Sequence, residues 1–485
     1  MSQDRALVDK LKAFLAELTP ATRAALVRGF DKERLRGRDD PVGALVLKAA
    51  RQHACETGEP LPRVASAMRR FFAPLDPFLI GEVTLRKQTG RIARASLTPI
   101  WTFLLRDVLP DRMRALTQAV LDAALADDEA RADALAAQAV DEAVPTLEAL
   151  LADADIHMER HRRLAGMIGG ERVYDDFKDA VRIFALRDEI RALLAEAPVA
   201  VVNPSGAAAL LMPLLEDFAR GRLRGADAAR DGAPADRATD DAGFRERLTY
   251  GLAALQHRFA DPIRLLALAV AAAGSDEVAR LERSPYGAAV DLALAEIDRA
   301  VQRLAHVLSA KGDPAGALKR FHGLTRAFGT TLDMDAPSAY RTRLTELRAL
   351  ASDLVAAEIE HAPALIRRAL DPVDSRTQRV SGFDRIEAEH AVFAARLFTA
   401  ARLGADALAI NDLVARLRAP VERAFEAANE HLPNLARGAD RTLAEEALRR
   451  MPFALDAAAA LSGEDYAAIL RRSFAAAIQD VAKAG

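Results

Sequence analysis

Apolar residues recur about every 3.6 residues along almost the whole chain of 485 residues. Val173, Phe177 and Val181, for example, fall on or beside one helical stripe. No segment keeps a sustained alternation of period two, which is the pattern of a half-buried strand, and the β-like runs 78–85 and 199–202 are short. We therefore predict an all-α protein, built from antiparallel helical bundles or a stacked helical array.

The composition agrees with this fold class. The chain is alanine-rich, about a fifth alanine, and its aromatic content is only 5%, so its helices can approach one another closely. A net charge of -3 with 51% hydrophobic residues argues against a disordered chain, and the single cysteine excludes a disulfide scaffold. Arginine outnumbers lysine 58 to 9, a bias that we attribute to a GC-rich, bacterial coding sequence rather than to nucleic-acid binding.

One segment has the composition of a linker. Residues 223–242 are rich in Gly, Asp, Arg and Ala and have almost no large apolar residue, so they cannot face a core. We predict a linker or long loop there, between an N-terminal helical region over 1–222 and a C-terminal helical bundle over 243–485. The sequence shows no convincing internal repeat with a period of 30–50 residues.

Residues 197–215 carry no charge and are nearly long enough to span a bilayer. Pro198, Pro204 and Pro213 interrupt them, and in lipid these breaks would leave backbone groups unsatisfied. The stretch 1–18 is amphipathic and lacks the uninterrupted apolar region of a secretory signal. These features predict a cytoplasmic protein with no membrane partner.

Two E-x-x-H pairs, Glu358/His361 and Glu387/His390, resemble the ligand pattern of di-metal helical bundles. Residues at i and i+3 project from the same helical face. One hairpin supplies only part of such a ligand set, however, and Pro363 is expected to bend the helix beside His361. We therefore predict no metal at these four residues and partly exposed carboxylates, while a helical metalloprotein remains an alternative.

Asp153, His157 and His161 follow one another at spacings of four, which would stack them on one helical face. The segment is not an H-E-x-x-H motif, because its glutamate, Glu159, comes two residues after the first histidine. We interpret the three residues as a polar face near the end of a helix.

The most distinctive stretch is a basic loop followed by a capped helix. Arg86, Lys87, Arg91 and Arg94 precede the helix that carries the only tryptophan, Trp101. Basic residues beside a helix N-terminus can hold an anion. We predict that these five residues form the ligand- or partner-binding surface, with unpaired guanidinium groups on the three arginines.

The charge is unevenly distributed along the N-terminal part. Residues 1–120 carry a net charge of +8, and residues 121–160 carry a net charge of -9. Because the two segments adjoin, we expect them to neutralise each other within the molecule. A nucleic-acid-associated protein that uses the basic N-terminal region is a second alternative, although the loop has no aromatic residues for base stacking.

Motifs for phosphate loops, dinucleotide binding and hydrolase nucleophiles are absent from the sequence. No catalytic residue and no cofactor are predicted. The sequence therefore favours a non-enzymatic binding, scaffold or adaptor protein whose partner is another protein.

Overall fold

The computed structural model describes residues 2–35, 40–57, 66–81, 84–126, 128–223, 241–372, 382–438 and 440–484. They form two compact units. The first unit comprises Met1–Gly81 and Arg91–Arg187, and the second comprises Glu82–Gly90 and Asp188–Gly485. The chain therefore passes from one unit to the other three times.

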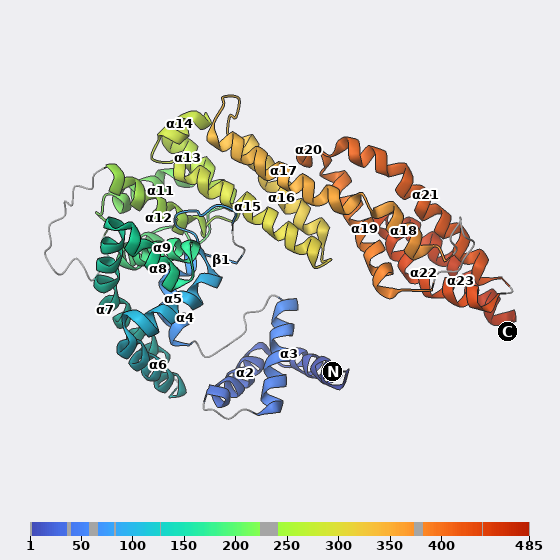
Figure 1. Cartoon of the computed structure of the whole chain (residues 1–485), viewed down its shortest axis with the longest axis horizontal. Helices are drawn as coiled ribbons and strands as arrows, with labels where there is room; N and C mark the ends of the chain where they lie inside the picture. The colour runs from blue at the N-terminus through green and yellow to red at the C-terminus, as the bar shows by residue number, and fades with distance from the viewer. Residues whose placement is uncertain are drawn as a thin grey trace. The chain divides into compact units, whose positions relative to one another are not determined.

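Helices dominate both units, so the fold class is all-α, as predicted (Figure 1). The elements of the first unit are α1 (Ser2–Glu17), α2 (Pro20–Leu35), α3 (Pro41–Thr57), α4 (Ala67–Phe71), η1 (Ala73–Phe78), β1 (Leu79–Ile80), β2 (Ile92–Ala93), η2 (Arg94–Ser96), α5 (Leu97–Phe103), η3 (Leu104–Val108), α6 (Pro110–Leu125), α7 (Glu129–Ile156), α8 (Met158–Ile168) and α9 (Glu171–Ala185). The two short strands pair in parallel, with Leu79 opposite Ile92.

The second unit continues the helical pattern. Its elements are α10 (Arg187–Glu196, which begins at the last residue of the first unit), α11 (Pro204–Ala219), α12 (Asp241–Gln256), η5 (Pro262–Arg264), α13 (Leu265–Ala273), α14 (Val278–Arg283), α15 (Gly287–Ser309), α16 (Pro314–Thr331), α17 (Ala339–Ile359), α18 (Ala362–Leu370), α19 (Arg385–Leu403), α20 (Ala405–Leu408), α21 (Asn411–Ala436), α22 (Arg441–Ser462) and α23 (Glu464–Ala484).

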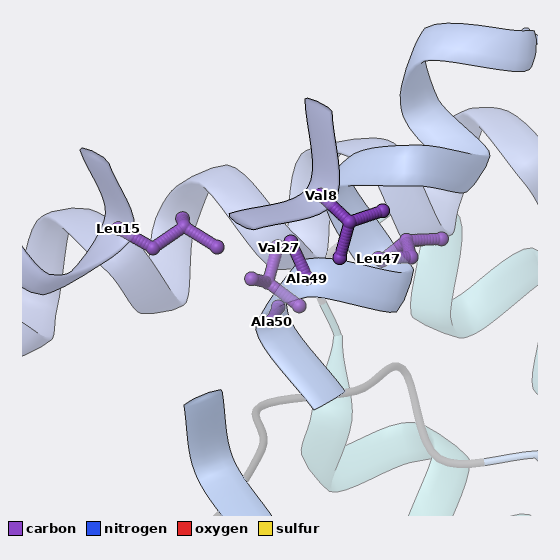
Figure 2. Packing of buried hydrophobic residues seen from close by; sticks show 6 residues of the cluster. All are labelled: Val8, Leu15, Val27, Leu47, Ala49 and Ala50. Carbon is purple, nitrogen blue, oxygen red and sulfur yellow. The ribbon is translucent and has the colours of Figure 1, made fainter. Parts of the chain in front are cut away.

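The helices α1, α2 and α3 have a small core of their own. Helix α3 packs against both α1 and α2. Figure 2 shows the buried side chains that meet there: Val8 and Leu15 from α1, Val27 from α2, and Leu47, Ala49 and Ala50 from α3. Two alanines take part in this cluster, which agrees with the close helix packing expected from the composition.

An aromatic cluster joins α4, α5 and α9 of the first unit. The rings of Phe71 and Phe72 lie 5.6 Å and 6.0 Å from that of Trp101. Phe184 packs 5.4 Å from Phe71. Aromatic residues make up only 5% of the chain, so their concentration here is notable. The ring contacts fix the position of α5 in the first unit.

The second unit is a succession of packed helices (Figure 1). Helix α11 packs against α12 and α13, and both of these pack against α15. Helix α15 in turn packs against α16 and α17. These two contact α19, and α19 contacts α18 and α22, followed by α21 and α23. The arrangement agrees with the stacked helical layers predicted from the period of the apolar residues.

The predicted linker falls on residues 224–240, which lie outside the described residues. The helices on either side of it, α11 and α12, pack against each other within the second unit. The boundaries of the two compact units fall at 81/82, 90/91 and 187/188. The expected division into 1–222 and 243–485 stays a prediction. Whether 223–242 acts as a linker stays a prediction.

Within the described part of the chain, no helix has both the length and the apolar character needed to cross a membrane. The uncharged stretch 197–215 is broken before Pro204, where α11 begins and Asn203 caps it by accepting a hydrogen bond from the Gly206 backbone N–H at 3.2 Å. The expected interruption at Pro213 is wrong, because this proline lies within α11.

Candidate binding groove

The five residues predicted as a binding surface are divided between the two units. Arg86 and Lys87 belong to the second unit, whereas Arg91, Arg94 and Trp101 belong to the first. Neither unit by itself therefore contains the predicted surface.

Arg91 corrects the prediction of an exposed, unpaired guanidinium. It is only 6% exposed, and its Nη1 donates to the Pro77 carbonyl oxygen at 3.3 Å. The backbone around it is fixed by the buried carboxylate of Asp176, which accepts hydrogen bonds from the Ala93 N–H at 3.1 Å and the Ser96 hydroxyl at 2.6 Å. Arg91 is thus a structural residue beside strand β2. Its charge alone would have favoured a position in solvent.

The remaining predicted residues have separate surroundings. Arg86 is exposed and pairs with Glu346 at 3.0 Å, so its guanidinium is not unpaired. Trp101 is half-buried in the aromatic cluster, and Arg94 is exposed. The segment before Arg86 is held by Asp298, which is 1% exposed and accepts from the Leu85 N–H at 2.9 Å. The loop therefore serves to anchor the chain in both units.

The acidic helix α7 pairs with arginines of the basic N-terminal part, as expected from the adjoining charges. Buried Arg70 forms ion pairs with Glu129 and Asp133, and Arg112 pairs with Glu142 at 2.7 Å. These contacts lie within the first unit and neutralise part of its basic excess. The nucleic-acid alternative stays a prediction.

Each E-x-x-H glutamate pairs with a cation. Glu358 contacts Lys311 Nζ at 2.6 Å, and Glu387 contacts Arg368 at 2.8 Å. Both carboxylates are partly exposed, as predicted, at 34% and 37%. Their charges are therefore balanced by basic side chains of the protein itself.

The two histidines of these pairs have different surroundings. His361 is exposed between two helices, since α17 ends at Ile359 and α18 begins at Ala362, which agrees with the bend expected from Pro363. His390 is half-buried within the regular helix α19. No three His, Cys, Asp or Glu side chains among the described residues are grouped to hold a metal ion. The metalloprotein alternative, with its four candidates Glu358, His361, Glu387 and His390, stays a prediction.

The polar face expected at Asp153, His157 and His161 does not lie on one helix. His157 has an extended backbone conformation, with φ -126° and ψ 106°, and separates α7 from α8. Asp153 pairs with Arg160, and His161 contacts Glu171 at 2.9 Å. The break at His157 thus lies between α7 and α8, and residues of both helices line one groove.

A groove of about 580 Å³ lies between α7, α8 and the C-terminal end of α5. Its lining is mostly apolar: Phe103, Val108, Ala149, Leu150, Ala154, Leu164 and Met167. The polar lining residues are Asp107, Thr146, Asp153, Arg160 and Arg163. A volume of this size, with an apolar lining and few polar groups, is typical of a ligand or partner site.

One wall of the groove is a π-helical turn, η3. The Leu109 N–H donates to the Leu104 carbonyl oxygen at 3.0 Å, a bond that spans five residues instead of four. The wider turn shifts Asp107 and Val108 out of the register of α5 and into the groove lining. Such turns occur often at functional sites.

The rim of the groove is charged, and most of the charges are paired. Asp153 pairs with Arg160, and Asp107 pairs with its neighbour Arg106 at 2.6 Å. Arg163 is exposed and makes no ion pair with any residue that the structure describes. The guanidinium of Arg163 is therefore left to interact with an anionic group at the mouth of an apolar groove.

Sequence reasoning missed this groove. The available signal was the pair Ile156 and Met158, the last residue of α7 and the first of α8, which are 75% and 68% exposed. Large apolar side chains at a helix break are unusual on a surface, and they come in sequence between Ala154 and Arg160, both of which line the groove.

Comparisons with known proteins identify no relative. No protein-family model matches the chain. No curated protein and no solved structure matches it either.

Proposed function

We propose that this chain is a non-enzymatic binding protein, and that the α7–α8 groove receives an amphipathic helix of a partner protein. The observation that carries the proposal is the combination of an apolar groove with a charged rim in one unit. Helix-in-groove recognition uses this combination, since apolar anchors at i, i+3 and i+4 enter the groove while polar residues remain at the edge.

Exposed apolar side chains favour a protein partner over a small molecule. Met167, in the groove lining, is 39% exposed, and Ile156 and Met158 at the helix break are more exposed still. A ligand that fills the groove alone leaves these side chains in water, whereas a helix laid along α8 can cover them. Methionine also adapts its shape to varied apolar surfaces.

The charges of the rim indicate the character of the partner. Both groove carboxylates, Asp107 and Asp153, have arginine neighbours, which supports binding rather than acid–base chemistry. Arg163 has no ion-pair partner among the described residues, so an acidic residue beside the apolar anchors of the partner would pair with it. We therefore expect an amphipathic helix with an acidic flank.

Site-specific photocrosslinking in cells tests the proposal. A photoreactive phenylalanine derivative replaces Ala149, an exposed residue of α7 that lines the groove. The control carries the same group at Ala152, which is also exposed on α7 but is not part of the lining. We expect a protein to be captured from position 149 and not from position 152.

The captured protein is then purified and its binding measured with two further variants. Ala149→Trp fills the groove without changing its charge, and Ala152→Trp places the same ring outside it. We expect Ala149→Trp to weaken binding at least about tenfold and Ala152→Trp to leave it unchanged. Equal crosslinking at both positions, or undiminished binding to Ala149→Trp, contradicts the proposal.

A further inference from the structure

A second cavity, of about 610 Å³, lies in the second unit between α15 and α16. One face of α15 and the first two turns of α16 line it. The charged lining residues are Glu296, Arg299, Arg303, Asp313 and Arg320. Three guanidinium groups thus face two carboxylates.

Both carboxylates already have structural partners. Glu296 is 3% exposed and forms an ion pair with Arg299. Asp313 caps α16 by accepting hydrogen bonds from the backbone N–H groups of Ala315 at 3.1 Å and Gly316 at 3.2 Å. The charge of Glu296 is therefore balanced by Arg299, and the carboxylate of Asp313 stays at the N-terminus of α16.

Arg303 and Arg320 are the other two guanidinium groups of the lining. Both are exposed, one on α15 and the other on α16. Arg320 makes no hydrogen bond or ion pair with any residue of the described ranges. Guanidinium groups present parallel N–H donors that match the oxygens of carboxylates and phosphates.

Small residues keep the space beside these arginines open. Ala300, Gly316 and Ala317 form the rest of the wall together with Val307. A Cβ at Gly316 would lie 2.7 Å from Asp313 Oδ2, so a larger residue there would displace the Asp313 carboxylate from its present position. The cavity is thus set by the packing of two regular helices, and its volume falls in the range of small-molecule sites.

We propose that this cavity binds a small molecule bearing a phosphate or carboxylate group. Arg303 and Arg320 bind the anionic group from the two helices. The ion pair with buried Glu296 holds Arg299 in position in the cavity lining. This site is separate from the α7–α8 groove, and the inference does not depend on the proposed function.

Isothermal titration calorimetry of the full chain tests the inference. Pyrophosphate, ATP and citrate are titrated separately at about 50 mM NaCl, and the preferred anion is repeated at about 150 mM NaCl. We expect binding in the micromolar to submillimolar range that weakens with salt. Preference for pyrophosphate and ATP identifies a phosphate ligand, and preference for citrate identifies a carboxylate ligand.

Two variants locate the site. Arg320→Ala, and separately Arg303→Ala, are expected to weaken binding of the preferred anion about tenfold. Arg326→Ala is the matched control, because Arg326 is exposed on the same helix α16 but outside the cavity lining. The inference is overturned if none of the three anions binds, or if Arg326→Ala weakens binding as much as Arg320→Ala does.

Discussion

The α7–α8 groove and the α15–α16 cavity have nearly equal volumes, about 580 Å³ and 610 Å³, but their linings differ in kind. The groove has an apolar floor and carboxylates that pair with neighbouring arginines. The cavity has few apolar side chains and more guanidinium groups than carboxylates. The comparison teaches that the composition of the lining, and not the volume, distinguishes the occupants that we propose.

The two sites also arise differently. The groove depends on irregular backbone, namely the break at His157 and the π-helical turn over Leu104–Val108. The cavity lies between two regular helices and depends on small side chains such as Ala300 and Gly316. Changes to the groove are therefore expected to act through packing, and changes to the cavity through charge.

The largest expected effect is at the floor of the groove. Phe103 is buried and its ring lies 5.9 Å from that of Phe177, so Phe103→Ala leaves a hole in the core and should cost about 3–5 kcal/mol of unfolding free energy. Urea unfolding followed by Trp101 fluorescence measures this, because the only tryptophan lies in the first unit. A loss below about 1 kcal/mol would show that the groove floor is not part of the core.

A smaller effect is expected in the lining of the cavity. Glu296→Gln removes the charge that neutralises Arg299, whose side chain is 23% exposed, and should cost about 1.5–3 kcal/mol. Far-UV circular dichroism follows this transition, while the Trp101 midpoint should not move. The control Glu389→Gln breaks an exposed pair with Arg385 and should cost about 0.5 kcal/mol or less. Equal losses in both variants would contradict the structural role of Glu296.

Two variants of Asp313 distinguish its capping of α16 from the effect of its charge in the cavity. Asp313→Asn keeps a capping side chain and should change stability little, whereas Asp313→Ala should cost about 1 kcal/mol. Both remove one negative charge beside Arg320, so both should bind the preferred anion more tightly. Thermal unfolding and calorimetry measure the two properties. Unchanged anion binding by both variants would place the anion away from Asp313, and weaker binding would contradict the expected repulsion.

The smallest effect on stability is expected at the groove rim. Met167 is 39% exposed, and Met167→Ala should lower the unfolding free energy by about 0.5 kcal/mol or less. The same change should weaken binding of the crosslinked partner, because it removes an apolar contact. Trp101 fluorescence and the binding measurement together check this. A loss of stability as large as that of Phe103→Ala would show that Met167 contributes to the core as much as Phe103 does.

The period of the apolar residues predicts the fold class because every helix must bury one face. Proline chemistry also predicts the interruption near His361, where α18 begins one residue before Pro363. The break at His157 has no such local signal, since no proline or glycine lies beside it, whereas Pro110 follows the π-helical turn by two residues and begins α6. Pro110 predicts the end of a helix but not a π-helical turn, and the apolar pair Ile156 and Met158 becomes informative only once its exposure is known. The groove depends on tertiary packing that these local signals do not describe.

The wrong prediction at Arg91 has a physical reason. Charge favours an exposed position for an arginine, but a carbonyl oxygen beside strand β2 satisfies this guanidinium inside the fold. The division of the basic loop between units depends on Asp298, which lies 213 residues after Leu85. A local sequence pattern cannot predict a contact between residues so far apart in the chain.

That separation has a consequence for synthesis on the ribosome. At about 5–20 residues per second, roughly 10–40 s pass between the appearance of Leu85 and that of Asp298. During this interval residues 91–187 emerge, so the first unit can close while the short segment 84–90 still lacks the helix that will hold it. Translation thus imposes an order of assembly in which the second unit captures a segment made long before its own helices.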